Sequence, residues 1–132
     1  MAYSDKVVDH FENPRNVGAF DSADACVGTG VAGMAGGDVI RLQIKVDAAT
    51  NVIAGARFKA HGNAASIASA SLLTEWVLGL ALDAAAQFKS SRIAQELALD
   101  PIKIHSSILA GDALQAAIND YRAKHGAAII KA

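Results

Sequence analysis

The strongest constraint on the fold comes from two neighbouring segments in which apolar and polar residues alternate. Residues 39–46 and 52–60 carry apolar side chains at every second position, and the positions between them include Arg41, Gln43, Lys45, Arg57 and Lys59. Alternation of this kind is typical of a strand with one buried face. Residues 47–51 supply turn-forming side chains, so the pair predicts an antiparallel hairpin.

After His61-Gly62 the spacing of apolar residues becomes helical. Asn63 is placed to cap a helix toward Leu80, because its side-chain oxygen can accept a hydrogen bond from a free backbone N–H. A third strand is predicted at residues 26–31. Helix, strands and then helices predict an α+β fold, with a three-stranded antiparallel sheet and helices packed on one side. The other predicted elements are helices at 3–12, 82–88 and 90–97, an extended segment at 102–105, and a C-terminal helix capped by Ser106 or Ser107 and frayed near Gly126.

Length and charge limit the classes of function. The 132 residues predict one domain, residues 1–132, and 52% hydrophobic composition supplies a core. Lys+Arg is 12 and Asp+Glu is 13, so there is no basic excess for nucleic acid. No apolar run approaches the roughly 20 residues that a spanning helix needs, and the first ten residues contain no apolar signal-peptide core. We therefore expect a cytoplasmic protein with neither a nucleic-acid nor a membrane partner.

Few side chains suggest chemistry by their type and spacing alone. The candidates are Asp38, the single cysteine Cys26, and the four histidines His10, His61, His105 and His125. One cysteine excludes an internal disulfide and a multi-cysteine metal cage within the chain. No two histidines have the spacing of a helical zinc motif, and Cys26 has no basic neighbour to activate it. Pattern alone therefore indicates only an α+β domain.

Several longer segments resemble the IscU/NifU N-terminal family of iron–sulfur cluster assembly scaffolds. The resemblance covers essentially the whole chain, and the segments that carry it are Asp9-His10-Phe11-Glu12-Asn13-Pro14-Arg15-Asn16-Val17-Gly18, Gly37-Asp38-Val39, Leu42-Gln43-Ile44-Lys45-Val46, Ala56-Arg57-Phe58-Lys59, Thr74-Glu75-Trp76-Val77 and Lys103-Ile104-His105. The chain is thereby identified as a member of a family of scaffolds, and not as an enzyme.

The resemblance implies a [2Fe–2S] cluster held by three cysteines, helped by a histidine or an aspartate. At the positions that match the family's cysteines this sequence has Gly36, Asn63 and Ser106, while Asp38 and His105 remain. Thiolates are the usual ligands of such clusters. We therefore expect no cluster in the isolated protein, and at most weak zinc or iron binding at Asp38 and His105.

The resemblance also implies partners. A family segment that an Hsp70-type chaperone recognises has a counterpart here in Leu99, Asp100, Pro101, Ile102 and Lys103, with one proline fewer and an added charge, which predicts weakened binding. A simple helix-breaking linker explains the same residues equally well. The other implied partners are a cysteine desulfurase and a scaffold paralogue, in a homo- or hetero-oligomer.

Three functions remain open at this point. The first is a scaffold-like protein without cysteine ligands, an adaptor or regulator that binds a cysteine desulfurase or a working scaffold. The second is an assembly protein that holds iron or zinc through Asp38, His105 and a ligand from a partner. The third is a repurposed structural or interaction subunit outside sulfur chemistry.

Overall fold

The two alternating segments form neighbouring strands of a three-stranded antiparallel sheet. The computed structural model describes residues 3–34 and 36–131, and the side chains up to residue 125. The strands are β1 (Val27–Gly33), β2 (Val39–Asp47) and β3 (Val52–His61), in the order β1-β2-β3. Arg41 lies opposite Lys59 and Leu42 opposite Phe58. The predicted hairpin and third strand are confirmed.

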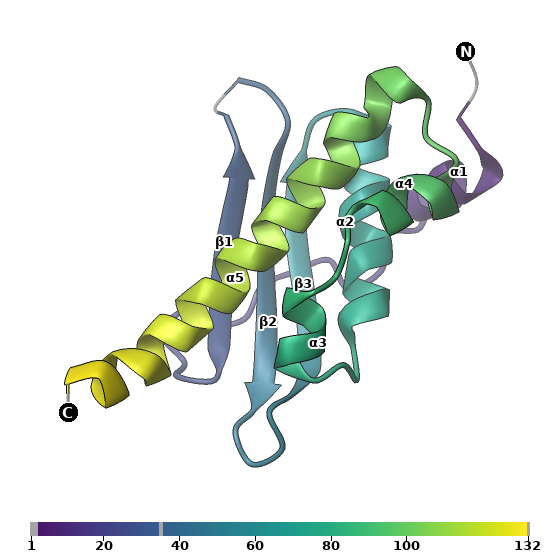
Figure 1. The fold of residues 1–132 in the computed structure, drawn as a ribbon. Coiled ribbons are helices and arrows are strands. Elements are labelled where there is room, and N and C mark those ends of the chain that lie inside the picture. Colours follow the sequence, from purple (N-terminus) through teal and green to yellow (C-terminus); the bar gives the residue numbers. More distant parts are fainter. Residues whose placement is uncertain (1–2, 35, 132) are drawn as a thin grey trace.

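Helices cover one face of this sheet, as predicted. In Figure 1 the long helix α5 crosses β1 and β2, and α2 lies beside β3. Among the described residues, no helix has the length and apolar character needed to cross a membrane. The helices are α1 (Asp5–Glu12), α2 (Ala64–Val77), α3 (Leu82–Ala86), α4 (Ser91–Leu97) and α5 (Ile104–Lys131), with a short 3-10 helix, η1 (Pro101–Lys103).

The core lies between the sheet and the helices. Its centre is the inward row of β2, where Ile40, Leu42, Ile44 and Val46 are at most 1% exposed. Within the described residues, no helix lies on the opposite face of the sheet. The segment between α1 and β1 crosses it, passing behind the strands in Figure 1, and the Phe20 N–H donates to Gln43 Oε1 at 2.7 Å.

Three sequence predictions about α5 and the segment before it were wrong. Residues 102–105 are not extended, because Pro101 opens a 3-10 turn that leads directly into α5. Proline suits the first position of a helical turn, since its fixed φ is already helical. Ser106 and Ser107 therefore lie inside the first turn of α5 and do not cap it. The helix also continues past Gly126 to Lys131.

Two glycines of β1 allow α5 to lie directly on the strand. A Cβ at Gly28 would overlap the carbonyl oxygen of Ala117, and one at Gly30 would overlap that of Ala113. Because both obstacles are helix backbone, no side chain can rotate away to make room. The close approach of α5 to β1 therefore depends on these two residues.

We expect Gly30→Ala to displace α5 and lower the free energy of unfolding by about 1–3 kcal/mol, the usual cost of overpacking a core. Urea denaturation of the variant measures this loss. Gly37→Ala is the matched control, because a Cβ there has no heavy atom closer than 3.7 Å. Equal stability of the two variants would show that α5 does not rest on the strand as described.

Candidate functional site

The side chain of Asp38 joins the loop before β2 to the start of α2. Its Oδ1 accepts a hydrogen bond from the Asn63 backbone N–H at 3.0 Å. Its Oδ2 accepts from Asn63 Nδ2 at 2.6 Å and from the Ser66 hydroxyl at 2.9 Å. Gly62 makes this approach possible, because its φ is +129° and a Cβ there would collide with the Asp38 carboxyl group. Both carboxylate oxygens are thus engaged by the protein itself.

Ser106 extends these contacts to α5. Its hydroxyl oxygen lies 3.0 Å from that of Ser66 and 3.5 Å from Asn63 Oδ1, and both serines are fully buried. Each hydroxyl has one proton. Ser66 therefore donates to the Asp38 carboxylate, and Ser106 donates to Ser66 at 3.0 Å in preference to Asn63 Oδ1 at 3.5 Å. We call Asp38, Asn63, Ser66 and Ser106 the Asp38 cluster.

Asn63 also has the capping role that the sequence predicts. Its Oδ1 accepts from the Ser66 backbone N–H at 3.1 Å, and α2 begins at the next residue. One amide side chain therefore caps the helix with its oxygen and binds Asp38 with its nitrogen.

His105 stands at the outer edge of the cluster. Its Nε2 lies 3.5 Å from Asp38 Oδ2, and its side chain is 60% exposed against 19% for Asp38. Burial raises the pKa of the Asp38 carboxyl group. Hydrogen bonds from Ser66, the Asn63 backbone and His105 outweigh this, so that the pKa lies below its usual value. Asp38 is therefore an anion at neutral pH.

Gly36 lies near the cluster without joining it. It is exposed, its φ is +85°, and a Cβ built on it has no heavy atom within 4 Å. The same loop borders a hollow of about 260 Å³, lined by Gly33, Met34, Gly37, Asp38, His105 and Leu109. Position 36 thus has open space around it, two residues before Asp38 in the chain.

The structure brings four of the predicted site positions together and leaves Cys26 apart. Asp38, Asn63, His105 and Ser106 are in contact, as described above. Cys26 precedes β1 at the opposite end of the sheet, about 26 Å from Asp38 at the usual rise per strand residue. Within residues 3–34 and 36–131, no group of three or more His, Cys, Asp or Glu side chains could hold a metal ion.

The sequence reasoning missed Ser66. Its role was visible only as spacing, since it lies three residues after a capping asparagine, where a side chain faces the start of the helix. The contact with Asp38 spans 28 positions in the chain and follows from the fold.

His10, one of the four candidate histidines, forms a pair with Ser71 in the packing of α1 on α2. His10 is 6% exposed and its Nδ1 lies 2.7 Å from the Ser71 hydroxyl. Burial lowers the pKa of His10, the Arg15 charge adds to this, and Glu75 opposes it. Ser71 also accepts from the Arg15 backbone N–H at 2.9 Å. Since Ser71 is fully buried, this pair has a structural role.

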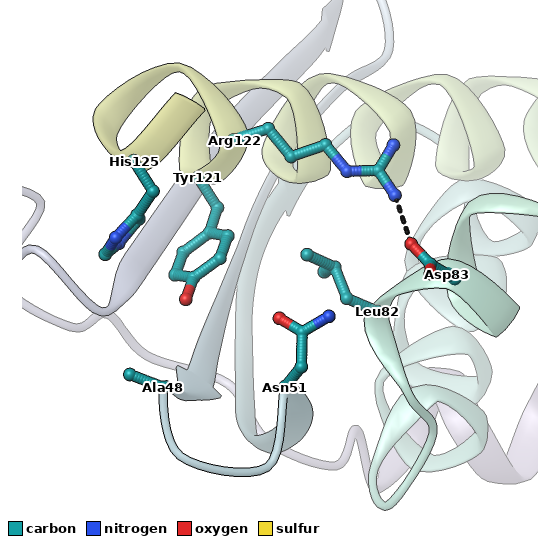
Figure 2. A pocket seen from close by; sticks show the side chains of 7 residues that line it. All are labelled: Ala48, Asn51, Leu82, Asp83, Tyr121, Arg122 and His125. Carbon is teal, nitrogen blue, oxygen red and sulfur yellow. Dashed lines mark hydrogen bonds and ion pairs between the residues drawn. The ribbon is translucent and has the colours of Figure 1, made fainter. Parts of the chain in front are cut away.

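A second groove, of about 410 Å³, lies at the turn between β2 and β3 (Figure 2). Arg122 donates to Asp83 Oδ1 at 2.8 Å across it, and His125 Nε2 lies 2.7 Å from the Ala25 carbonyl oxygen. Burial raises the pKa of Tyr121, whose ring lines the same groove. Arg122 and Asp83 are thus paired with each other, and His125, one of the four candidate histidines, contacts a backbone carbonyl far from the Asp38 cluster.

The segment Leu99–Lys103, predicted as a chaperone motif, leads into α5. Ile102 is 72% exposed and lies in the 3-10 turn Pro101–Lys103. A partner that takes this segment in an extended form would have to unwind that turn first. Chaperone binding stays a prediction.

Comparison with known proteins decides the family. The model of the NifU-like N-terminal domain matches residues 2–128. The chain belongs to this family. It is 58% identical over 127 residues to the iron–sulfur cluster assembly scaffold protein IscU of Haemophilus influenzae, covering 96% of this chain and all of that one. The protein of the same name from Escherichia coli is 57% identical over 128 residues, 96% of this chain and 99% of that one.

Solved structures of this family support the fold. A NifU-like N-terminal protein from Brucella abortus matches with a TM-score of 0.66 at 18% identity, over 90% of this chain and 93% of that one. A scaffold protein for the SUF system from Fervidobacterium islandicum gives 0.67 at 18% identity, over 88% and 96%. At these identities the likeness concerns the fold alone, and it agrees with the predicted α+β class.

Proposed function

We propose that this member of the NifU-like N-terminal family works in iron–sulfur cluster assembly as a scaffold-like adaptor or regulator that carries no cluster. The relatives that match it nearly end to end are named assembly scaffold proteins, a name for a carrier and not for an enzyme. The observation that carries the proposal is the Asp38 cluster. In this cluster, Asn63 and Ser106 form hydrogen bonds with other protein groups, and these are two of the positions where the resemblance implies cysteine ligands.

The residues at this site do not fit a [2Fe–2S] cluster. Such clusters need thiolate donors, and the one thiol of the chain belongs to Cys26, at the other end of the sheet. Both carboxylate oxygens of Asp38 accept hydrogen bonds from the protein. Of the two potential metal ligands, His105 is therefore the one with a freely exposed side chain. Acceptance of sulfur as a persulfide also requires a cysteine sulfur at the site. We therefore derive no cluster chemistry here.

The partners of the proposal are a cysteine desulfurase and a working scaffold. The fold would present a docking surface, since Asn63 caps α2 and Ser106 lies buried in the first turn of α5. Replacing thiolates by such residues removes the metal donors while keeping the backbone. The chain would then act as a single domain that binds a component of the assembly machinery. It would either form a homo- or hetero-oligomer with a scaffold or bind the desulfurase. An Hsp70-type chaperone is a weaker candidate partner.

A second candidate function rests on the pairing of His105 with Asp38. The two are 3.5 Å apart, and His105 is exposed enough for a partner to supply a third metal ligand beside it. Two donors fall short of the four that a closed zinc site uses. Zinc titration separates this alternative from the first, because nanomolar binding that His105→Ala abolishes would favour it over the adaptor.

We expect the purified chain to form a complex with the cysteine desulfurase of its own organism or with that organism's working IscU. Analytical gel filtration of the mixed proteins, followed by titration calorimetry, measures it. Complex formation must not require added iron or sulfide, since the chain offers no cluster ligands. If the chain binds neither partner, the result would favour a role outside sulfur chemistry and overturn the proposal.

A further inference from the structure

The face of the sheet that no helix covers collects cationic side chains. Residues of β2 and β3 alternate, so that Leu42 and Phe58 point into the core while their neighbours point outward. The outward positions form what we call the basic sheet face: Arg41, Lys45, Arg57 and Lys59. This patch is assembled from two strands, and the net charge of −1 conceals it.

The chain itself covers one end of the basic sheet face. The ring of Phe20 has the Lys45 ammonium 5.8 Å and the Arg57 guanidinium 4.9 Å from its centre. Asp24 Oδ2 lies 3.8 Å from Lys45 Nζ. The covering segment is thus an irregular piece of chain, with turns over residues 22–26, that supplies an aromatic ring and a carboxylate to the cations beneath it.

The other end of the same face has no such cover. Arg41 and Lys59 are directly opposite each other across the two strands. Among residues 3–34 and 36–131, neither has an ion pair or an aromatic ring against it, in contrast to Lys45 and Arg57. Like charges directly opposite in a sheet are destabilising. Val31, the neighbour of Arg41 on β1, is 56% exposed.

We propose that this end of the basic sheet face, formed by Arg41, Lys59 and Val31, binds an acidic segment of a partner protein. The covered end shows the chemistry that the uncovered end requires, because carboxylates would relieve the repulsion between Arg41 and Lys59 and an apolar side chain would cover Val31. The surface lies on the side of the sheet away from the Asp38 side chain's partners in α2 and α5, so the inference goes beyond the proposed function and does not depend on it.

A protein segment suits this surface better than nucleic acid does. Single-stranded nucleic acid binds where cations alternate with rings on which bases can stack. The aromatic ring of Phe20, which lies on the described part of this face, is already covered by Lys45 and Arg57. A carboxylate-rich segment needs cations and an apolar contact, and both are present.

The test is fluorescence polarisation with a short fluorescein-labelled peptide of glutamates around one phenylalanine. We expect salt-sensitive binding that weakens about tenfold or more in Arg41→Glu/Lys59→Glu. The matched control is Lys89→Glu/Arg122→Glu, which changes the net charge equally at two other exposed positions and should bind nearly as well as the parent. No binding by the parent, or equal loss in both double variants, would overturn the proposal.

A stability measurement gives an independent readout. Arg41→Glu alone places a carboxylate opposite Lys59, so the midpoint of urea unfolding should rise while peptide binding falls. A single-stranded oligonucleotide of the same charge as the peptide is the competing probe. Tighter binding of the oligonucleotide, or a lower unfolding midpoint for Arg41→Glu, would contradict the inference.

Discussion

The triple variant Gly36→Cys, Asn63→Cys, Ser106→Cys is expected to take up a [2Fe–2S] cluster under conditions in which the parent takes up none. Positions 63 and 106 already face each other, with Asn63 Oδ1 and Ser106 Oγ 3.5 Å apart. Position 36 lies in the loop that ends at Asp38, with open space around it. Three thiolates would then stand beside Asp38 and His105. Visible absorption after desalting, with iron and sulfide analysis, measures the uptake.

We expect the triple variant to stay folded in spite of a lower free energy of unfolding. Loss of the Asn63 cap costs about 0.5–2 kcal/mol, and a side chain at position 36, where φ is +85°, adds about 1–3 kcal/mol of backbone strain. The matched control is Gly36→Cys, Asn63→Cys, Ser107→Cys, in which the third cysteine stands at position 107 and Ser106 is kept. Ser107 is equally buried, but its hydroxyl donates to the Ile104 carbonyl and takes no part in the Asp38 cluster. A folded triple variant that stays colourless would show that the three positions no longer converge on a ligand site.

Asp38→Ala is expected to lower the free energy of unfolding by about 2–3 kcal/mol, because it leaves buried donors without an acceptor. The Asn63 backbone N–H, its side-chain amide and the Ser66 hydroxyl all donate to this carboxylate. Urea denaturation at neutral pH measures the effect. The same change at Asp112, an exposed residue of α5, should alter stability little.

This prediction separates two views of Asp38. A carboxylate kept only as a metal ligand is held at a cost to stability, so its removal usually stabilises the protein. A carboxylate built into a hydrogen-bonded cluster stabilises it. Unchanged or increased stability of Asp38→Ala would therefore mean that Asp38 is a retained ligand, and would favour the metal-binding alternative.

The sheet and the helix cap could be predicted because local patterns decide them. Alternation in residues 39–46 and 52–60 has one structural solution when one face is buried, and Asn63 follows a strand-ending glycine at the point where helical spacing starts. The start of α5 could not be predicted in this way. Ile102-Lys103-Ile104 alternates like a strand, but the turn set by Pro101 and the packing of Ser106 against α2 override the pattern.

For the candidate site, the sequence predicts which positions are involved but not the hydrogen bonds between them. The family resemblance indicates Gly36, Asn63 and Ser106, and the fold brings the last two together. That they close a network through Ser66 depends on contacts between residues 28 to 43 positions apart, which no local pattern records. The basic sheet face differs in this respect, since the outward positions of the two strands are readable from the alternation once the strands are paired.

Anaerobic reconstitution of the parent chain with iron, sulfide and reductant measures whether the isolated protein can hold a cluster. If hydrogen bonds stand in place of metal donors at the Asp38 cluster, the folded protein holds none by itself. We expect the desalted protein to be colourless, with no stoichiometric iron or sulfide. A [2Fe–2S] cluster that survives desalting at one per chain would contradict the account.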